Sequence, residues 1–152
     1  MQQMLIRNVF MAPLIAPNRI RRKGFRIPAC GGIMRAMIRD LTRSICATLP
    51  GAEVSDPWGG GHDAWKVGGK MFACIGAVTP GISVKTDSIE TAEMLIAAGV
   101  GVKAPYFHRS WLLLPFDAPE DELRHRLFAS YRLVRATLTK KAQAALGPAP
   151  QA

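Results

Sequence analysis

Trp65-Lys66-Val67-Gly68-Gly69-Lys70-Met71-Phe72-Ala73 is the stretch that decides how this chain folds. Two alternating strand patterns meet at Gly68-Gly69, and such a dipeptide favours a type I′ hairpin turn because both central residues need a positive φ. We therefore predict antiparallel strands over about 62–67 and 70–78. In this register the facing pairs are Val67 with Lys70, Lys66 with Met71 and Trp65 with Phe72, so that the two lysines project from opposite faces.

The residues before the hairpin predict a helix and a loop. Apolar residues recur at helical spacing, which indicates a helix over about 34–48 that ends at Pro50-Gly51. The stretch 52–61 contains Trp58 followed by three glycines, a composition that we expect to be irregular.

The residues after the hairpin complete an α+β pattern. We predict a third strand over 81–86, a second helix capped by Asp87 or Ser88 and ending before Gly99, a strand over 110–116, and a long last helix after Pro119. The order α-β-β-β-α-β-α predicts a four-stranded antiparallel sheet with the helices packed on one face. The other face is left for water or for a partner, and we expect the function to lie there.

Composition restricts the class of protein. The chain has 152 residues, of which 49% are hydrophobic and 20% charged, as expected of one globular domain. No apolar run approaches the roughly 20 residues that span a bilayer, so we expect no membrane association. The three cysteines Cys30, Cys46 and Cys74 contain no close pair; the last two fit a core, and a reducing cytoplasm is expected.

The net charge of +9 is unevenly distributed. Residues 1–33 hold six basic residues and no acid, whereas 34–152 hold 14 basic and 11 acidic residues and carry only +3. We interpret 1–33 as a disordered, basic leader that precedes a natural start at Met34; a transit-like segment is the alternative. The domain is predicted over 34–146, with a frayed tail over 147–152.

Several short motifs, taken in order, resemble the MmcQ/YjbR family of small bacterial domains. They are Leu49-Pro50-Gly51-Ala52-Glu53, Trp58, the hairpin from Val67 to Ala73, Ile82-Ser83-Val84-Lys85-Thr86, Ala104-Pro105-Tyr106 with Trp111, and Ala129-Ser130-Tyr131. The resemblance covers about 110 residues from Met34. It implies a fold related to the frataxin-like CyaY group, with a double-wing motif like that of a phage transcription factor. A histidine commonly precedes the strand tryptophan in the family, whereas Ser110 stands there in this chain, and His108 is the nearest substitute.

The resemblance implies DNA binding. We expect a monomer that contacts the phosphate backbone of double-stranded DNA through a basic sheet face, with Lys66, Lys70, Lys85, His108 and Arg109 as the contacting residues. The alternative is a protein-interaction or small-ligand module that uses the bare sheet face or a cleft near Trp58, Tyr106 and Trp111. A third explanation is that the strand lysines bind no partner and only keep an exposed sheet face soluble.

Catalytic and metal-binding patterns are weak. His62 and Asp63 are adjacent on a predicted strand and point to opposite faces, so they cannot form a base and its orienting group. Gly59-Gly60-Gly61 lacks the preceding strand and following lysine of a phosphate loop, and the three histidines are dispersed. We therefore expect neither an enzyme nor a cofactor or metal site.

Overall fold

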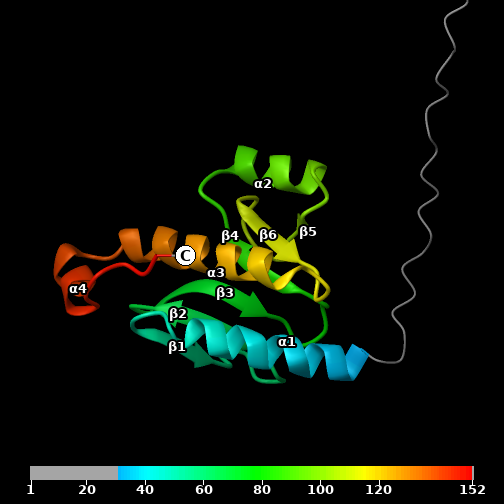
Figure 1. The fold of residues 1–152 in the computed structure, drawn as a ribbon, viewed down its shortest axis with the longest axis horizontal. Coiled ribbons are helices and arrows are strands. Elements are labelled where there is room, and N and C mark those ends of the chain that lie inside the picture. The colour runs from blue at the N-terminus through cyan, green and yellow to red at the C-terminus, as the bar shows by residue number, and fades with distance from the viewer. Residues whose placement is uncertain (1–30, 152) are drawn as a thin grey trace, which may run out of the picture.

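The computed structural model of the protein describes residues 31–151, so nearly all of the predicted leader, including Cys30, lies outside the described residues. Figure 1 shows the order of the elements along the chain. They are α1 (Gly31–Cys46), β1 (Ala52–Ser55), β2 (Asp63–Val67), β3 (Lys70–Ile75), β4 (Ile82–Lys85), α2 (Ile89–Ala97), β5 (Val102–Lys103), β6 (Trp111–Leu114), α3 (Glu120–Ala136) and α4 (Lys140–Ala145).

The sheet has six antiparallel strands in the order β1-β2-β3-β4-β6-β5, so the prediction of four strands was wrong. The four predicted strands correspond to β2, β3, β4 and β6, which occupy the middle. The two additional strands are both edges, and they are four and two residues long. Short edge strands are common because they limit pairing with other chains, and their brevity leaves little periodicity to detect in a sequence.

The hairpin turn at Gly68-Gly69 is confirmed, with φ of 54° and 76° at the two glycines. Val67 faces Lys70 and Lys66 faces Met71, as predicted, but Trp65 faces Ala73 and not Phe72. The register shifts at this point, which is the signature of a β-bulge. Both Phe72 and Ala73 belong to the core beneath the helices, and the Phe72 ring meets Tyr131 edge-on at 5.5 Å between centroids.

Helices α1, α2 and α3 contribute to one hydrophobic core on a single face of the sheet. In Figure 1, α1 and α3 lie side by side across this face. The long last helix of the prediction is instead two helices, because α3 ends at Ala136 and the Thr139 hydroxyl caps α4 by accepting from the Ala142 amide at 3.2 Å. No helix of the described part is long and apolar enough to cross a membrane.

Two neighbouring side chains of α3 tie the sheet to the rest of the chain. The buried Ser130 hydroxyl accepts from the Lys85 amide at 2.9 Å and donates to the Phe72 carbonyl at 2.5 Å, so it joins β3 to β4 just beyond their last paired residues, Ala73 and Val84. The buried Tyr131 donates its phenolic hydrogen to the Pro50 carbonyl at 2.6 Å. These bonds fix α3 across the middle of the sheet.

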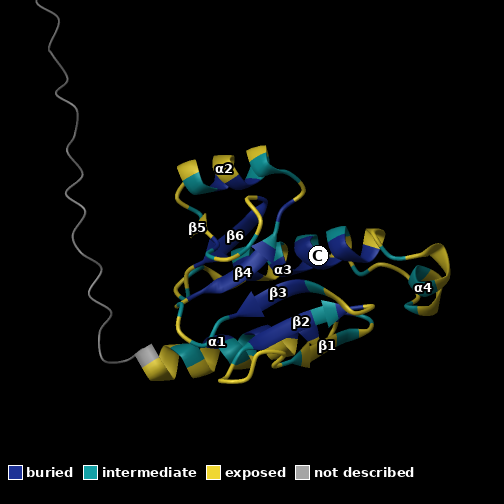
Figure 2. Cartoon of the chain, turned by 180° about the vertical axis from the view of Figure 1, so that it is seen from behind, coloured by how far each residue is buried: buried dark blue, intermediate teal, exposed yellow. Residues whose placement is uncertain are grey.

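The other face of the sheet, which we call the open face, is not covered by a helix from residues 31–151 (Figure 2). Strand register assigns to it Glu53, Ser55, Ala64, Lys66, Met71, Cys74, Ser83, Lys85, Val102, Trp111 and Leu113. Its middle consists of small, buried side chains. A second, smaller hydrophobic cluster covers the part nearest β6, where Phe107 and Ala104 pack on Trp111 and Leu113.

Candidate functional site

The three lysines predicted as contact residues lie at the same end of the sheet. This is the end at which β2 and β4 finish and β3 and β6 begin, because Val67 pairs with Lys70 and Lys85 pairs with Trp111. Lys66 and Lys85 lie on the open face. Lys70 lies on the opposite face, as its register predicted, and its Nζ donates to the carbonyl and the hydroxyl of Thr137 at 3.0 Å each. The lysines therefore share an end of the molecule and not a single face.

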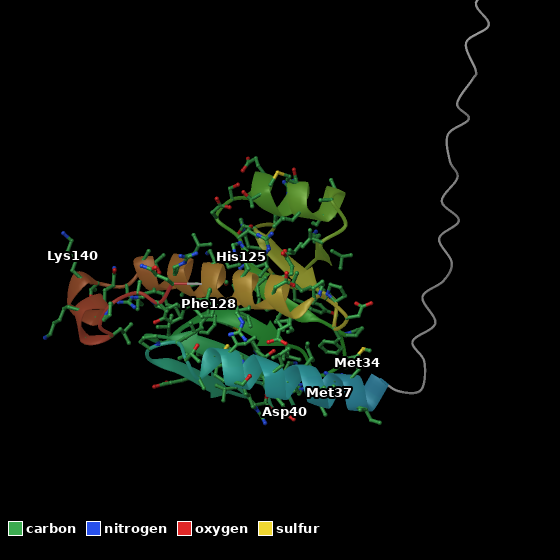
Figure 3. All side chains as sticks on the ribbon, in the orientation of Figure 1. Met34, Met37, Asp40, His125, Phe128 and Lys140 are labelled. Atoms are coloured by element: carbon green, nitrogen blue, oxygen red, sulfur yellow. The ribbon has the colours of Figure 1, made fainter. Side chains whose placement is uncertain are left out.

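Three further cations join this end from the carboxyl-terminal part of the chain. Leu138 packs against the hairpin turn so closely that a Cβ on Gly68 would lie 2.8 Å from its side chain. This contact brings the end of α3 and the start of α4 next to the turn. Figure 3 shows Lys140 at this end and Met34 and Met37 at the opposite end. We call the set Lys66, Lys70, Lys85, Arg132, Lys140 and Lys141 the basic end.

The cations of the basic end are not neutralised by ion pairs. Within residues 31–151, none of the six lies within 4.0 Å of a carboxylate oxygen, although Glu53 faces Lys66 across β1 and β2, and Asp87 follows Lys85 by two residues. Five arginines elsewhere, Arg39, Arg43, Arg109, Arg124 and Arg126, are paired with carboxylates. Arg39 lies 2.8 Å from Asp63, Arg124 lies 3.1 Å from Glu120, and Arg126 lies 2.7 Å from Glu122. Arg35, Lys103 and Arg135 also lack a carboxylate partner among residues 31–151, so six of the nine cations without one lie at the basic end.

His108 and Arg109 lie in the loop between β5 and β6 and do not add free charge to the basic end. Arg109 pairs with Glu93 of α2 at 2.6 Å. The His108 Nδ1 lies 3.0 Å from the Ser110 hydroxyl, so the histidine of this chain contacts the residue that stands where the family commonly has a histidine. The expectation that His108 and Arg109 contact DNA remains a prediction.

The three aromatic residues predicted to line a cleft are not brought together. Trp58, 60% exposed, lies between β1 and β2 with its ring 5.3 Å from the His62 ring, at the end of the sheet opposite the basic end. Tyr106 is fully exposed, with a φ of 66°, in the loop before β6. Trp111 is 8% exposed because Phe107 stacks on it at 4.6 Å. The prediction of a common cleft for Trp58 and Tyr106 is therefore wrong, because the two residues lie at opposite ends of the sheet.

The residues that our sequence reasoning missed as site residues are Arg132, Lys140 and Lys141. A signal for them exists, because the chain holds six lysines and arginines and no acid from Leu123 to Ala152. Of these six, Arg124 and Arg126 are paired, and the buried Arg135 donates to the carbonyls of Gln143, Gly147 and Pro148. The other three stay free for a partner.

Within residues 31–151, no three His, Cys, Asp or Glu side chains lie close enough together to hold a metal ion. The two described cysteines, Cys46 and Cys74, are free and buried, as predicted. Burial raises the pKa of the Cys46 thiol to about 12 and that of the Cys74 thiol to about 11, which makes both poor nucleophiles.

Comparison with known proteins agrees with the resemblance found in the sequence. The family model described as YjbR matches residues 47–133, more than half of the chain. The chain belongs to the YjbR family. A crystal structure of a Deinococcus radiodurans protein, DR2400, described as carrying the domain DUF419, matches with 25% identity and a TM-score of 0.64, over 72% of this chain and 87% of that chain. No curated protein matches the chain at a significant level.

The motifs that indicated the YjbR family contact one another in the folded domain. Tyr131 bonds to Pro50 and packs on Phe72, and Ser130 bonds to Phe72 and to Lys85. These residues of the YjbR domain come from motifs that are far apart in the sequence, and each of them holds two parts of the fold together. Membership of the family therefore explains the fold, while a function has to be argued from the surface.

Proposed function

We propose that this YjbR protein binds nucleic acid through phosphate contacts made by the basic end. The observation that carries the proposal is the gathering of unpaired cations from three separate parts of the chain. Lys66 and Lys70 come from the hairpin, Arg132 from α3, and Lys140 and Lys141 from α4. Lysine and arginine contacts to phosphates supply most of the affinity of non-specific binding and carry no sequence information.

The expected salt dependence of binding follows from the number of cations that contact phosphates. If about five phosphates are neutralised, log Kd changes with log salt concentration with a slope of about 4.5, so that affinity falls several-hundred-fold between 50 and 200 mM salt. Lysines that merely keep the surface soluble would produce no such dependence. Salt titration therefore separates the two explanations.

The test uses the full chain and a labelled 20-base-pair duplex of random sequence, with binding measured by fluorescence anisotropy at several NaCl concentrations. Lys140→Ala/Lys141→Ala should weaken binding and lower the salt slope by about two. Arg43→Ala/Arg124→Ala is the matched control, because it removes the same charge from exposed positions outside the basic end. All variants retain residues 1–30, so any contribution from that segment is common to them.

Two results would overturn the proposal. One is the absence of binding by the full chain at 50 mM NaCl. The other is an equal loss of slope in the two double variants, which would mean that net charge and not the basic end determines binding.

A protein or small-ligand partner on the open face is the second candidate. Apolar side chains lie between its two lysines, and Val102 at its edge is 57% exposed. Binding of this kind would depend little on salt. It would be reduced by Met71→Ser or Val102→Ser and unaffected by Lys140→Ala/Lys141→Ala, and the reverse pattern would exclude it.

A further inference from the structure

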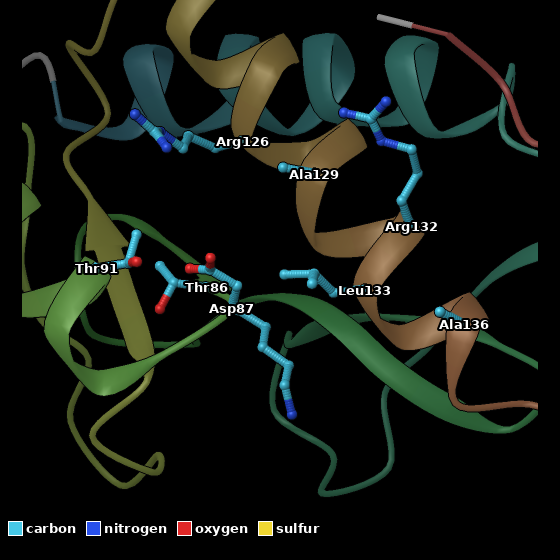
Figure 4. A pocket seen from close by; sticks show the side chains of 9 residues that line it. Thr86, Asp87, Thr91, Arg126, Ala129, Arg132, Leu133 and Ala136 are labelled. Carbon is cyan, nitrogen blue, oxygen red and sulfur yellow. The ribbon is translucent and has the colours of Figure 1, made fainter.

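A groove opens between α3 and the connection from β4 to α2, next to the basic end (Figure 4). Its volume is about 410 Å³, within the range of about 300–1,000 Å³ that small ligands occupy. Ala129, Leu133 and Ala136 form its floor along one side of α3. The hollow exists because two of these three side chains are no larger than a methyl group.

The walls of the groove differ in charge. On the α3 side Figure 4 shows Arg126 and Arg132 on either side of Ala129, directed away from each other. Arg126 is engaged by Glu122, whereas Arg132 makes no ion pair or hydrogen bond with any residue in 31–151. Lys85 also lines the groove. Of the basic end, Arg132 therefore lines the groove from α3, while Lys85 borders it from β4 and its side chain lies on the open face.

The facing wall consists of Thr86, Asp87 and Thr91. The Thr86 hydroxyl is already used, since it lies 2.8 Å from the carbonyls of Ser88 and Ser110. Hydrogen bonds from the Thr91 side chain and the Ser88 amide hold the pKa of Asp87 below its ordinary value, so this carboxylate is charged at neutral pH. It repels a phosphate from this wall. An anionic group that enters the groove is therefore attracted by Arg132, next to an apolar floor.

An occupant that fits this arrangement has a flat, uncharged ring system joined to a phosphate. We propose that the groove holds one unpaired nucleotide of a single-stranded nucleic acid, with the base over Ala129, Leu133 and Ala136 and its phosphate next to Arg132. This inference rests on the proposed function, because the strand continues over the basic end. A base inside a duplex is stacked and paired, so it is not free to lie over the groove floor. The groove therefore gives the protein a preference for single strands over duplexes.

The test compares a 12-nucleotide single strand with the 12-base-pair duplex of the same sequence, using fluorescence anisotropy and the full chain. The wild type should bind the single strand more tightly. Ala136→Leu fills the groove and should weaken single-strand binding at least fivefold while leaving duplex binding within twofold. Ala144→Leu is the matched control, because Ala144 is exposed on α4 outside the groove, and it should change neither. Lys140→Ala/Lys141→Ala should weaken both.

The outcomes distinguish the two proposals. Binding of neither ligand by the wild type would overturn the proposed function and this inference together. Equal binding of both ligands, or an equal effect of Ala136→Leu on both, would overturn only the groove, while the dependence on Lys140 and Lys141 would still support the basic end.

A second measurement needs no variant and therefore does not depend on Ala136→Leu folding. Adenosine 5′-monophosphate added to ¹⁵N-labelled wild-type protein should shift the amide signals of Ala129, Leu133 and Ala136 in a saturable manner. Inorganic phosphate at the same concentration should not. Equal shifts with phosphate, or no shift with the nucleotide, would show that the apolar floor is not used and would overturn the groove.

Discussion

Ser130→Ala should be among the most destabilising conservative substitutions in this domain. The fully buried hydroxyl satisfies two backbone groups, the Lys85 amide at 2.9 Å and the Phe72 carbonyl at 2.5 Å. Each group left without a partner costs about 1–3 kcal/mol. Alanine recovers about 0.5 kcal/mol through its higher helix propensity. The net loss in the free energy of unfolding is about 1.5–5.5 kcal/mol, which lowers the Tm of a domain of this size by roughly 5–25 °C.

Urea denaturation followed by circular dichroism measures this loss. The midpoint should fall while the slope m stays constant, because the folded state keeps its compactness. Ser44→Ala in α1 is the matched control. The Ser44 hydroxyl donates only to the Leu41 carbonyl at an exposed position, so its loss should change stability by less than about 0.5 kcal/mol. A Ser130→Ala midpoint equal to that of Ser44→Ala would refute the reasoning, since the hydroxyl would then not be bridging the strands.

Two further predictions concern titratable groups. The Gly61 amide donates to Asp56 and holds the pKa of that carboxyl below its ordinary value. The carboxylate therefore stabilises the fold above the unfolded-state pKa, and this contribution is lost as the pH falls through the lower, folded-state pKa. Asp56→Asn should lose less stability than the wild type between pH 5 and pH 3 in urea titrations, and an identical loss would contradict this. The raised pKa values of Cys46 and Cys74 predict that folded Cys30→Ser protein at pH 8 shows almost no rapid reaction with a thiol reagent. After unfolding, the same protein should consume two equivalents of the reagent. Rapid labelling of two thiols in the folded protein would contradict the burial.

The middle of the fold could be predicted from the sequence, and its edges could not. Gly68-Gly69 specifies a turn through backbone geometry alone, and the strands beside it follow from alternation over five or more residues. Val102–Lys103 is too short to show a period, so only its pairing with β6 defines it. At the bulge, Phe72 contacts Tyr131, almost 60 residues away, and a local pattern contains no information about such a contact.

The candidate site was predicted in part. The opposite orientation of Lys66 and Lys70 followed from strand periodicity. The approach of α4 to the hairpin could not be predicted in this way. It requires a new helix to begin after Thr139 and Leu138 to pack on Gly68. Paired and free arginines also look alike in a sequence. Arg124 and Arg132 lie on the same helix, yet only Arg124 has a carboxylate partner among the described residues.

The placement of charge along α3 and α4 separates a structural explanation from a functional one. Glu120, Asp121 and Glu122 lie in the first turn of α3 and Arg135 in its last, as the helix dipole favours. Lys140 and Lys141 are placed against the dipole, in the first turn of α4. Replacing both by glutamate should therefore leave stability unchanged or raise it by up to about 1 kcal/mol, while salt-sensitive DNA binding falls. Binding would then fall without a loss of stability, as measured by anisotropy and by urea denaturation on the same preparation. A loss of stability in this variant would mean that the two lysines support the fold, and their arrangement would no longer favour a phosphate partner.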